Sequence, residues 1–206
     1  MTSPIPRRAA LGLAALAPFI LPRPAAAQAP PAAAQQAVEQ FHAALLQVMR
    51  EAQRLGTRGR YDRLSPVMAQ AFDLAAMTRI SVGPPWSGFS AQEQAALLDA
   101  FARWCVATYA NRFDGFSGES FQTLGVQQQP NGDALVRTQL NRTGGQEPVA
   151  LSYLMRGNPP RVVDIFLTGT ISELASRRAE FTGLIREGGA ARVVQELNAR
   201  ASRLLG

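Results

Sequence analysis

The chain has 206 residues and a formal charge of +6, and arginine supplies all 21 of its basic residues. Residues 1–27 carry three of these arginines and no Asp or Glu, so their removal would lower the charge to +3. A balance this weak excludes the class of nucleic-acid-binding proteins, which show a clustered basic face. The remaining 179 residues (206 minus 27) fit one domain with a substantial core. The single cysteine, Cys105, allows no intrachain disulfide.

The first residues have the pattern of a cleavable export signal. Arg7 and Arg8 precede an apolar stretch over residues 9–21, and alanines 25–27 supply the small side chains that signal peptidase requires. The stretch is shorter than the ~20 apolar residues of a permanent membrane anchor. We therefore expect residues 1–27 to be a signal peptide and residues 28–206 to be one soluble periplasmic domain. Export by the Sec route and by the twin-arginine route both remain open.

Apolar periodicity predicts three of the helices. Residues 35–55 have an apolar side chain at every third or fourth position, and this helix is expected to stop at Gly56. A shorter helix is expected over residues 61–72, and a last one over residues 191–204.

Two further helices are predicted to open with a capping box, in which a Ser or Thr is followed three residues later by Glu. The first starts at Ser90 and ends at Gly115, and the second starts at Thr170 and ends at the Gly188-Gly189 pair. Glycine at these ends is typical of helix termination because it adopts left-handed backbone conformations at low cost.

Between the two capped helices, alternating apolar and polar residues predict strands over 121–129, 135–142, 149–156 and 161–167. Their connections are short and contain Pro, Asn and Gly, which is typical of antiparallel neighbours. The predicted fold class is therefore α+β: a curved four-stranded antiparallel sheet with helices packed on one side.

Three segments resemble one protein family. Residues 162–181 read Val-Val-Asp-Ile-Phe-Leu-Thr-Gly-Thr-Ile-Ser-Glu-Leu-Ala-Ser-Arg-Arg-Ala-Glu-Phe, a strand that turns at a glycine into a basic helix. Residues 72–83, Phe-Asp-Leu-Ala-Ala-Met-Thr-Arg-Ile-Ser-Val-Gly, and residues 90–113 add to the likeness. Together they resemble the MlaC family of periplasmic phospholipid-binding carriers, also called the toluene-tolerance auxiliary component. The Thr-Ile-Ser-Glu-Leu-Ala stretch is similar to its hopanoid-biosynthesis-associated HpnM branch.

The resemblance implies a periplasmic lipid carrier, not an enzyme, that needs no cofactor or metal. It would bind one phospholipid, or a hopanoid-related lipid, by its tails. It would shuttle this lipid between an inner-membrane ABC transporter with an MCE-domain subunit and an outer-membrane lipoprotein complex, supporting outer-membrane lipid asymmetry. At about 0.8 kcal/mol per CH₂, two tails of roughly 30 methylenes represent on the order of 24 kcal/mol in water. We therefore expect a hydrophobic lipid pocket of ~1,000 Å³ or more between the sheet and the helices.

The candidate lipid-binding residues are side chains expected on the inward faces of helices and strands: Met77, Ile80, Leu97, Phe101, Trp104, Tyr109, Val149, Leu151, Tyr153, Val163, Ile165 and Leu167. The candidate headgroup or partner contacts are the polar residues Arg79, Asn111, Arg112 and Arg178. Ordinary core packing and surface ion pairing remain open as alternative roles for these two groups.

Four other residues receive structural interpretations. Asp164 alternates with Val163 and Ile165, so it should point away from the pocket and find hydrogen-bond partners elsewhere. His42 is expected at the surface or on a helix flank, Cys105 as a small apolar side chain, and Arg177 in an ion pair with Glu173 four residues earlier.

Two alternative functions remain open. A small cone-shaped α+β isomerase or hydrolase would need an inward carboxylate, for which Asp99 and Asp164 are the candidates. A periplasmic adaptor would need only a solid core. No metal-ligand spacing, phosphate-binding glycine loop or nucleophile elbow is present in the sequence.

Overall fold

The computed structural model describes residues 29–168 and 170–206, so the predicted signal peptide lies outside the described residues. The elements follow in the order α1 (Pro31–Arg50), α2 (Ala52–Ala71), α3 (Leu74–Val82), a 3-10 helix η1 (Pro84–Gly88), α4 (Ala91–Arg112), β1 (Ser120–Gln128), β2 (Ala134–Asn141), β3 (Val149–Arg156), β4 (Arg161–Leu167), β5 (Ile171–Ser172) and α5 (Glu173–Leu205). This arrangement confirms the α+β class. Within the described ranges, no helix is long and apolar enough to cross a bilayer.

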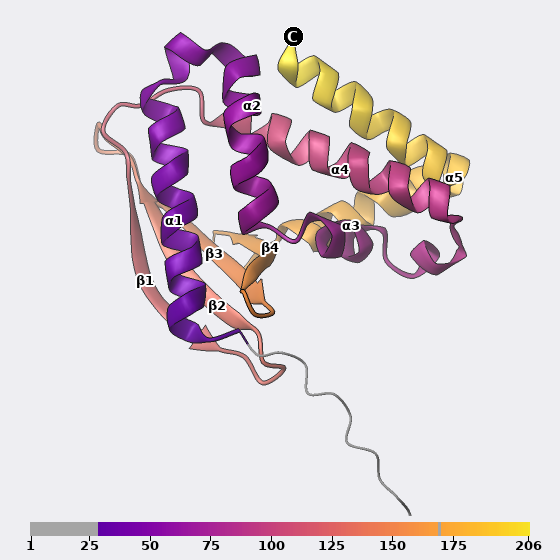
Figure 1. The fold of residues 1–206 in the computed structure, drawn as a ribbon, viewed down its shortest axis with the longest axis horizontal. Coiled ribbons are helices and arrows are strands. Elements are labelled where there is room, and N and C mark those ends of the chain that lie inside the picture. The colour runs from indigo at the N-terminus through magenta and orange to yellow at the C-terminus, as the bar shows by residue number, and fades with distance from the viewer. Residues whose placement is uncertain (1–28, 169) are drawn as a thin grey trace, which may run out of the picture.

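The strands form an open antiparallel meander in the order β1-β2-β3-β4-β5 (Figure 1). The four longer strands lie within one residue of the predicted segments. The predicted strand count was one short. β5 contains only Ile171 and Ser172, and two residues are too few to show an alternating pattern.

The predicted end of the first helix, Gly56, is a break in the helical backbone, and a second irregularity precedes it. The chain turns at Glu51, and the helical hydrogen bonds resume at Ala52. Gly56 lies inside α2 as a non-helical residue, with φ 61° and ψ 178°. The predicted stop at Gly56 is therefore confirmed as a break between two helical segments, and the turn at Glu51 is the feature that the periodicity missed. Met49 and Ala52 are both buried in the core, so the apolar periodicity continues across the turn and hides it.

The predicted cap of α4 is confirmed and that of α5 is corrected. The backbone N–H of Ser90 donates to Glu93 Oε2 at 2.8 Å, and the N–H of Glu93 donates to Ser90 Oγ at 3.3 Å. At α5 the capping residue is Ser172, whose Oγ accepts from the N–H of Ala175 at 2.9 Å. Thr170 is not the cap because pairing with β4 keeps the chain extended through Ser172.

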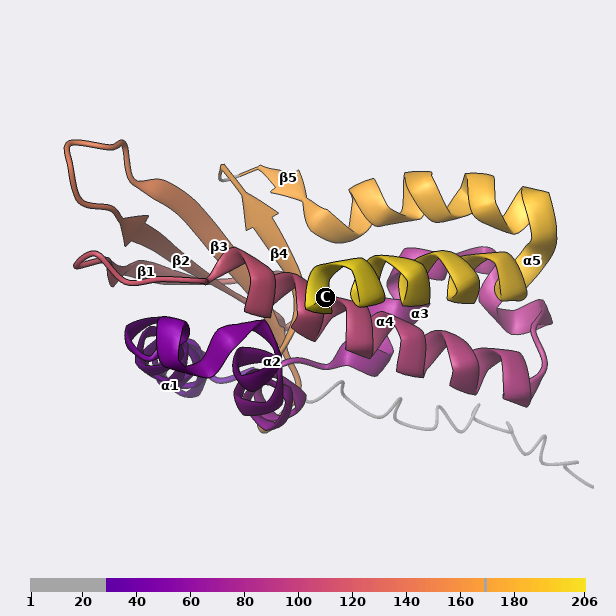
Figure 2. The same cartoon turned by 90° about the horizontal axis from the view of Figure 1, so that it is seen from above.

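The helices cover one face of the sheet. Figure 2 shows α1 and α2 along the sheet, and shows α5 folded back on itself so that its second half lies beside α4. The reversal is at Gly188 and Gly189, the predicted helix end, where the backbone is non-helical. The short helix α3, which the periodicity did not predict, is capped by Asp73, whose Oδ1 accepts from the N–H of Ala76 at 2.8 Å.

Candidate functional site

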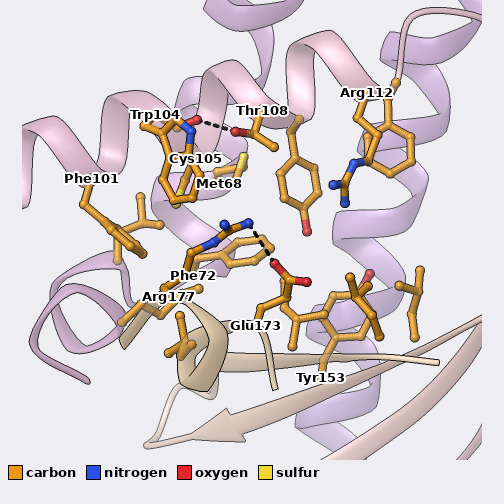
Figure 3. A pocket seen from close by; sticks show the side chains of 18 residues that line it. Met68, Phe72, Phe101, Trp104, Cys105, Thr108, Arg112, Tyr153, Glu173 and Arg177 are labelled. Carbon is orange, nitrogen blue, oxygen red and sulfur yellow. Dashed lines mark hydrogen bonds and ion pairs between the residues drawn. The ribbon is translucent and has the colours of Figure 1, made fainter. Parts of the chain in front are cut away.

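An apolar cavity of about 90 Å³ lies between the sheet and the helices. Helices α2 to α5 and strands β3 and β4 all contribute to its wall (Figure 3). The lining residues are Met68, Phe72, Leu74, Met77, Phe101, Trp104, Cys105, Thr108, Tyr109, Arg112, Phe113, Leu151, Tyr153, Ile165, Leu167, Glu173, Leu174 and Arg177. The volume is far below the expected ~1,000 Å³, because large side chains, including Phe72 and Tyr153, pack closely around it.

Helix α4 and the paired strands β3 and β4 form opposite walls. The α4 contributions are spaced by three or four residues from Phe101 to Arg112, so they share one face of the helix. On the sheet, Leu151 pairs with Leu167, and Tyr153 pairs with Ile165, so these four side chains project to one side. The cavity therefore lies where a helix face meets an apolar cross-strand patch.

The structure brings most of the candidate lipid-binding residues together. Those that line the cavity are Met77, Phe101, Trp104, Tyr109, Leu151, Tyr153, Ile165 and Leu167. Three of the others, Ile80, Leu97 and Val149, lie outside the lining: Leu97 is fully buried in the core, Val149 packs at the start of β3, and Ile80 borders a groove beside α5.

Val163 also lies outside the lining, because the pairing of β3 with β4 shifts register. Leu154 pairs with Asp164, but the next residue, Met155, pairs with Val162. This irregularity leaves Val163 without a partner and places Val162 in the core position. Val163 is buried, but simple alternation along the strand does not place it correctly in the cavity lining.

Of the candidate headgroup contacts, Arg112 lines the cavity and Arg79, Asn111 and Arg178 do not. Asn111 is exposed and does not line the cavity, because adjacent residues on a helix point in different directions and its neighbour Arg112 is the one directed to the cavity. The Arg178 guanidinium donates to the Ile80 carbonyl at 2.9 Å from Nε and 2.6 Å from Nη2. Arg178 therefore joins α5 to the end of α3.

Residues at the start of α5 enter the cavity lining without having been proposed as ligand contacts. They are Glu173, Leu174 and Arg177. Arg177 Nη2 lies 3.2 Å from Glu173 Oε2, as the sequence spacing predicted, and Nη1 lies 3.4 Å from Glu180 Oε2. The guanidinium also lies over the Trp104 ring, 4.7 Å from its centroid. Local spacing predicts the ion pair, but only the packing of α5 on α4 places it in the cavity.

Tyrosine and cysteine side chains in the lining are held in their neutral forms. Burial raises the pKa of the Cys105 thiol to about 12, and burial also raises the pKa values of the Tyr109 and Tyr153 hydroxyls. Glu173 raises the Tyr109 pKa further, while Arg112 lowers it. Cys105 thus behaves as a small apolar side chain, as expected.

His42 lies beside this wall and is buried, so its predicted position at the surface was wrong. Its side chain is 4 % exposed, its Nε2 lies 3.0 Å from the Tyr153 hydroxyl, and its ring stacks on Phe121 with centroids 3.8 Å apart. Burial lowers the His42 pKa from 6.5 to about 4, although Glu39 acts in the opposite direction. The expectation of a surface position was wrong because α1 packs His42 against Phe121 and Tyr153, which are far away in the sequence.

Asp164 points away from the cavity and has hydrogen-bond partners, as the alternation predicted. Its Oδ2 accepts from the Ser172 hydroxyl at 2.6 Å, and its Oδ1 accepts from the N–H of Ile165 at 2.7 Å. Neither Asp164 nor Asp99 lines the cavity, where the carboxylate is that of Glu173. Among the described residues, no group of His, Cys, Asp and Glu has the arrangement of a metal site.

Comparison with known proteins agrees with this architecture. The family model described as MlaC protein matches residues 19–199. No curated protein sequence matches this chain. Among solved structures, the chain is similar to the phospholipid-binding protein from Ralstonia solanacearum in complex with a phospholipid, with a TM-score of 0.73 and 23% identity over 84% of this chain and 99% of that one. The family match spans most of the sequence, and the chain belongs to the MlaC family.

Proposed function

We propose that this protein is a periplasmic carrier that binds one phospholipid by its acyl tails. The apolar cavity between α4 and the β3-β4 pair carries this proposal. Membership of the MlaC family supports lipid binding, and the similar Ralstonia protein was solved with a phospholipid. The cavity offers no inward acid–base pair, which favours binding over catalysis: its carboxylate is ion-paired to Arg177, and its thiol and hydroxyls stay protonated.

Binding of a phospholipid must widen the cavity. A volume of about 90 Å³ accommodates only part of one tail, since a single water requires roughly 10 to 15 Å³ on the same measure. Each methylene left in water costs about 0.8 kcal/mol, so a tail held outside would oppose binding strongly. We expect the helices that contribute to the lining to separate from β3 and β4 when the tails enter.

The carrier would exchange lipid with membrane-bound partners. We propose an inner-membrane ABC transporter with an MCE-domain subunit and an outer-membrane lipoprotein complex as these partners. The HpnM-like Thr-Ile-Ser-Glu-Leu-Ala stretch, which leads into α5, supports a hopanoid-related lipid and a different inner-membrane transporter as the alternative ligand and partner. Export would use the N-terminal signal over residues 1–27.

Native mass spectrometry of protein purified from its own periplasm tests the proposal. We expect one bound diacyl or polycyclic lipid per protein, and uptake of one lipid by the delipidated protein from phospholipid vesicles. A clean protein mass together with no uptake from vesicles would overturn the proposal.

A pair of variants on β3 tests whether the cavity is the binding site. Leu151 lines the cavity, whereas Met155, on the same face of the strand, is fully buried outside it. Leu151→Arg should fold and lose lipid, because its guanidinium can reach the cavity mouth while its stem occupies the space of a tail. Met155→Arg should lose several kcal/mol of stability, because it buries an unpaired charge in the core. A folded Leu151→Arg protein that keeps its lipid would exclude this cavity.

A further inference from the structure

Three of the residues that line the cavity are charged: Arg112, Glu173 and Arg177. The other lining side chains are apolar or neutral, and the pKa values of the thiol and the tyrosines lie above their usual range. The formal charge of the lining is therefore +1. A cavity that served tails alone would need no charged side chains, since desolvating them costs free energy.

These three charges surround one turn of α4. Arg177 and Glu173 both act electrostatically on Cys105, and Arg112 and Glu173 both act on Tyr109. Figure 3 shows the Arg177–Glu173 pair in the middle of the cavity, with the Arg112 guanidinium directed into the same space from the end of α4. The Arg177–Glu173 pair and Arg112 thus line the same cavity.

The contact between Glu173 and Arg177 is one that a ligand can replace. The two side chains are each 26% exposed, and an ion pair of this kind contributes only about 0.2–1 kcal/mol. Arg177 keeps Glu180 and the Trp104 ring as partners when Glu173 leaves. A phosphodiester offers two anionic oxygens to the planar guanidinium fork, so it binds arginine more tightly than a single carboxylate contact does.

We propose that the Glu173 carboxylate occupies the phosphate position in the empty protein, and that a phospholipid's phosphodiester displaces it to bind Arg177 and Arg112. This inference rests on the proposed lipid-carrier function and specifies how the headgroup is recognised. Arg112 and Arg177 are the binding residues, and Glu173 is a positioning residue that keeps Arg177 directed into the cavity until lipid arrives. The formal charge of +1 on the lining matches the −1 charge of a phosphodiester. An uncharged lipid receives no electrostatic contribution to its binding from these residues.

The test compares phosphatidylglycerol with diacylglycerol of the same acyl chains, each offered to the delipidated protein in micelles of an uncharged, phosphate-free detergent. Glu173→Gln should bind phosphatidylglycerol roughly two- to fivefold more tightly, because Arg177 loses its competing partner. Arg177→Gln and Arg112→Gln should each bind it roughly tenfold more weakly, because a charge-assisted contact is lost. Binding of diacylglycerol should stay unchanged in all three variants.

Glu180→Gln is the matched control. It removes the other carboxylate partner of Arg177 from the same helix, but Glu180 does not line the cavity. We expect no gain in phosphatidylglycerol affinity from this variant, since Glu173 still occupies Arg177. A gain equal to that of Glu173→Gln would overturn the proposal.

The remaining outcomes separate this inference from the carrier function. If Glu173→Gln weakens binding of both lipids, Glu173 has only a structural role and the inference is wrong, while lipid carriage stands. The same conclusion follows if Arg112→Gln, which changes an exposed residue, binds phosphatidylglycerol as the unmodified protein does. If the unmodified protein takes up neither lipid, the proposed function fails and the inference with it.

Discussion

His42 links the stability of the protein to pH. It is the single histidine of the chain, and its burial beside Tyr153 lowers its pKa from 6.5 to about 4. Between these two pH values the unfolded chain binds a proton at the imidazole and the folded protein does not. Acid therefore favours unfolding: the stabilisation is complete above pH 6.5 and is lost progressively as the pH falls towards 4.

We expect the free energy of unfolding to fall by about 2 kcal/mol between pH 7 and pH 5. Urea titrations at pH 7, 6 and 5 measure it. His42→Gln keeps a hydrogen-bonding group near Tyr153 but cannot titrate, so its free energy of unfolding should change little over this range. An equally steep decrease in His42→Gln would assign the pH dependence to other groups.

Among the elements, α5 depends on two glycines for its reversal. Gly189 has φ 64° and ψ −153°, a conformation that is essentially restricted to glycine. This residue lets the second half of α5 fold back against α4 (Figure 2). A side chain at Gly189 would meet no atom within 4 Å, so any cost of substitution comes from the backbone alone.

Gly189→Ala should therefore lower the free energy of unfolding by about 1–3 kcal/mol. Gly183→Ala in the same helix is the matched control, since Gly183 is helical and a Cβ there also meets no atom within 4 Å. That control should stabilise the protein by up to about 1 kcal/mol, because alanine has the higher helix propensity. Urea denaturation of both variants measures the two effects, and changes of the same sign would contradict this account of the reversal.

At the scale of the whole molecule, the cavity between the sheet and the helices is much smaller than the proposed ligand. Tails that enter between the helices and the sheet need the folded arrangement of both, so lipid should bind the folded protein and not the unfolded chain. Binding of that kind stabilises the folded state by about 2.7 kcal/mol at a free ligand concentration of 100 times Kd. For a chain of this length we expect the Tm of the lipid-loaded protein to exceed that of the delipidated protein by roughly 5–10 °C.

Differential scanning calorimetry of delipidated and reloaded protein checks this increase. Leu151→Arg, which should fold without binding lipid, provides the reference in which vesicles leave the Tm unchanged. An equal Tm for loaded and delipidated protein would show that the lipid does not bind the folded state in preference to the unfolded chain, which contradicts binding between the sheet and the helices.

Local signals in the sequence determined the elements. The Ser90–Glu93 capping box and the Gly188-Gly189 break act within a few residues, and both are present at the predicted positions. The four longer strands followed from alternation and turn residues, which are equally local. Helix spacing also placed Phe101, Trp104 and Arg112 on the face of α4 that lines the cavity.

Only the tertiary structure decided where those faces meet. Val163 lies at the shift in β4 pairing and outside the cavity lining, and the packing of α1 on the sheet buried His42 against Tyr153. Docking of α5 on α4 brought Glu173 and Arg177 into a lining whose other charged residue is Arg112. These features depend on contacts between residues far apart in the chain, and periodicity within a single element carries no information about the register, burial or volume that such contacts produce.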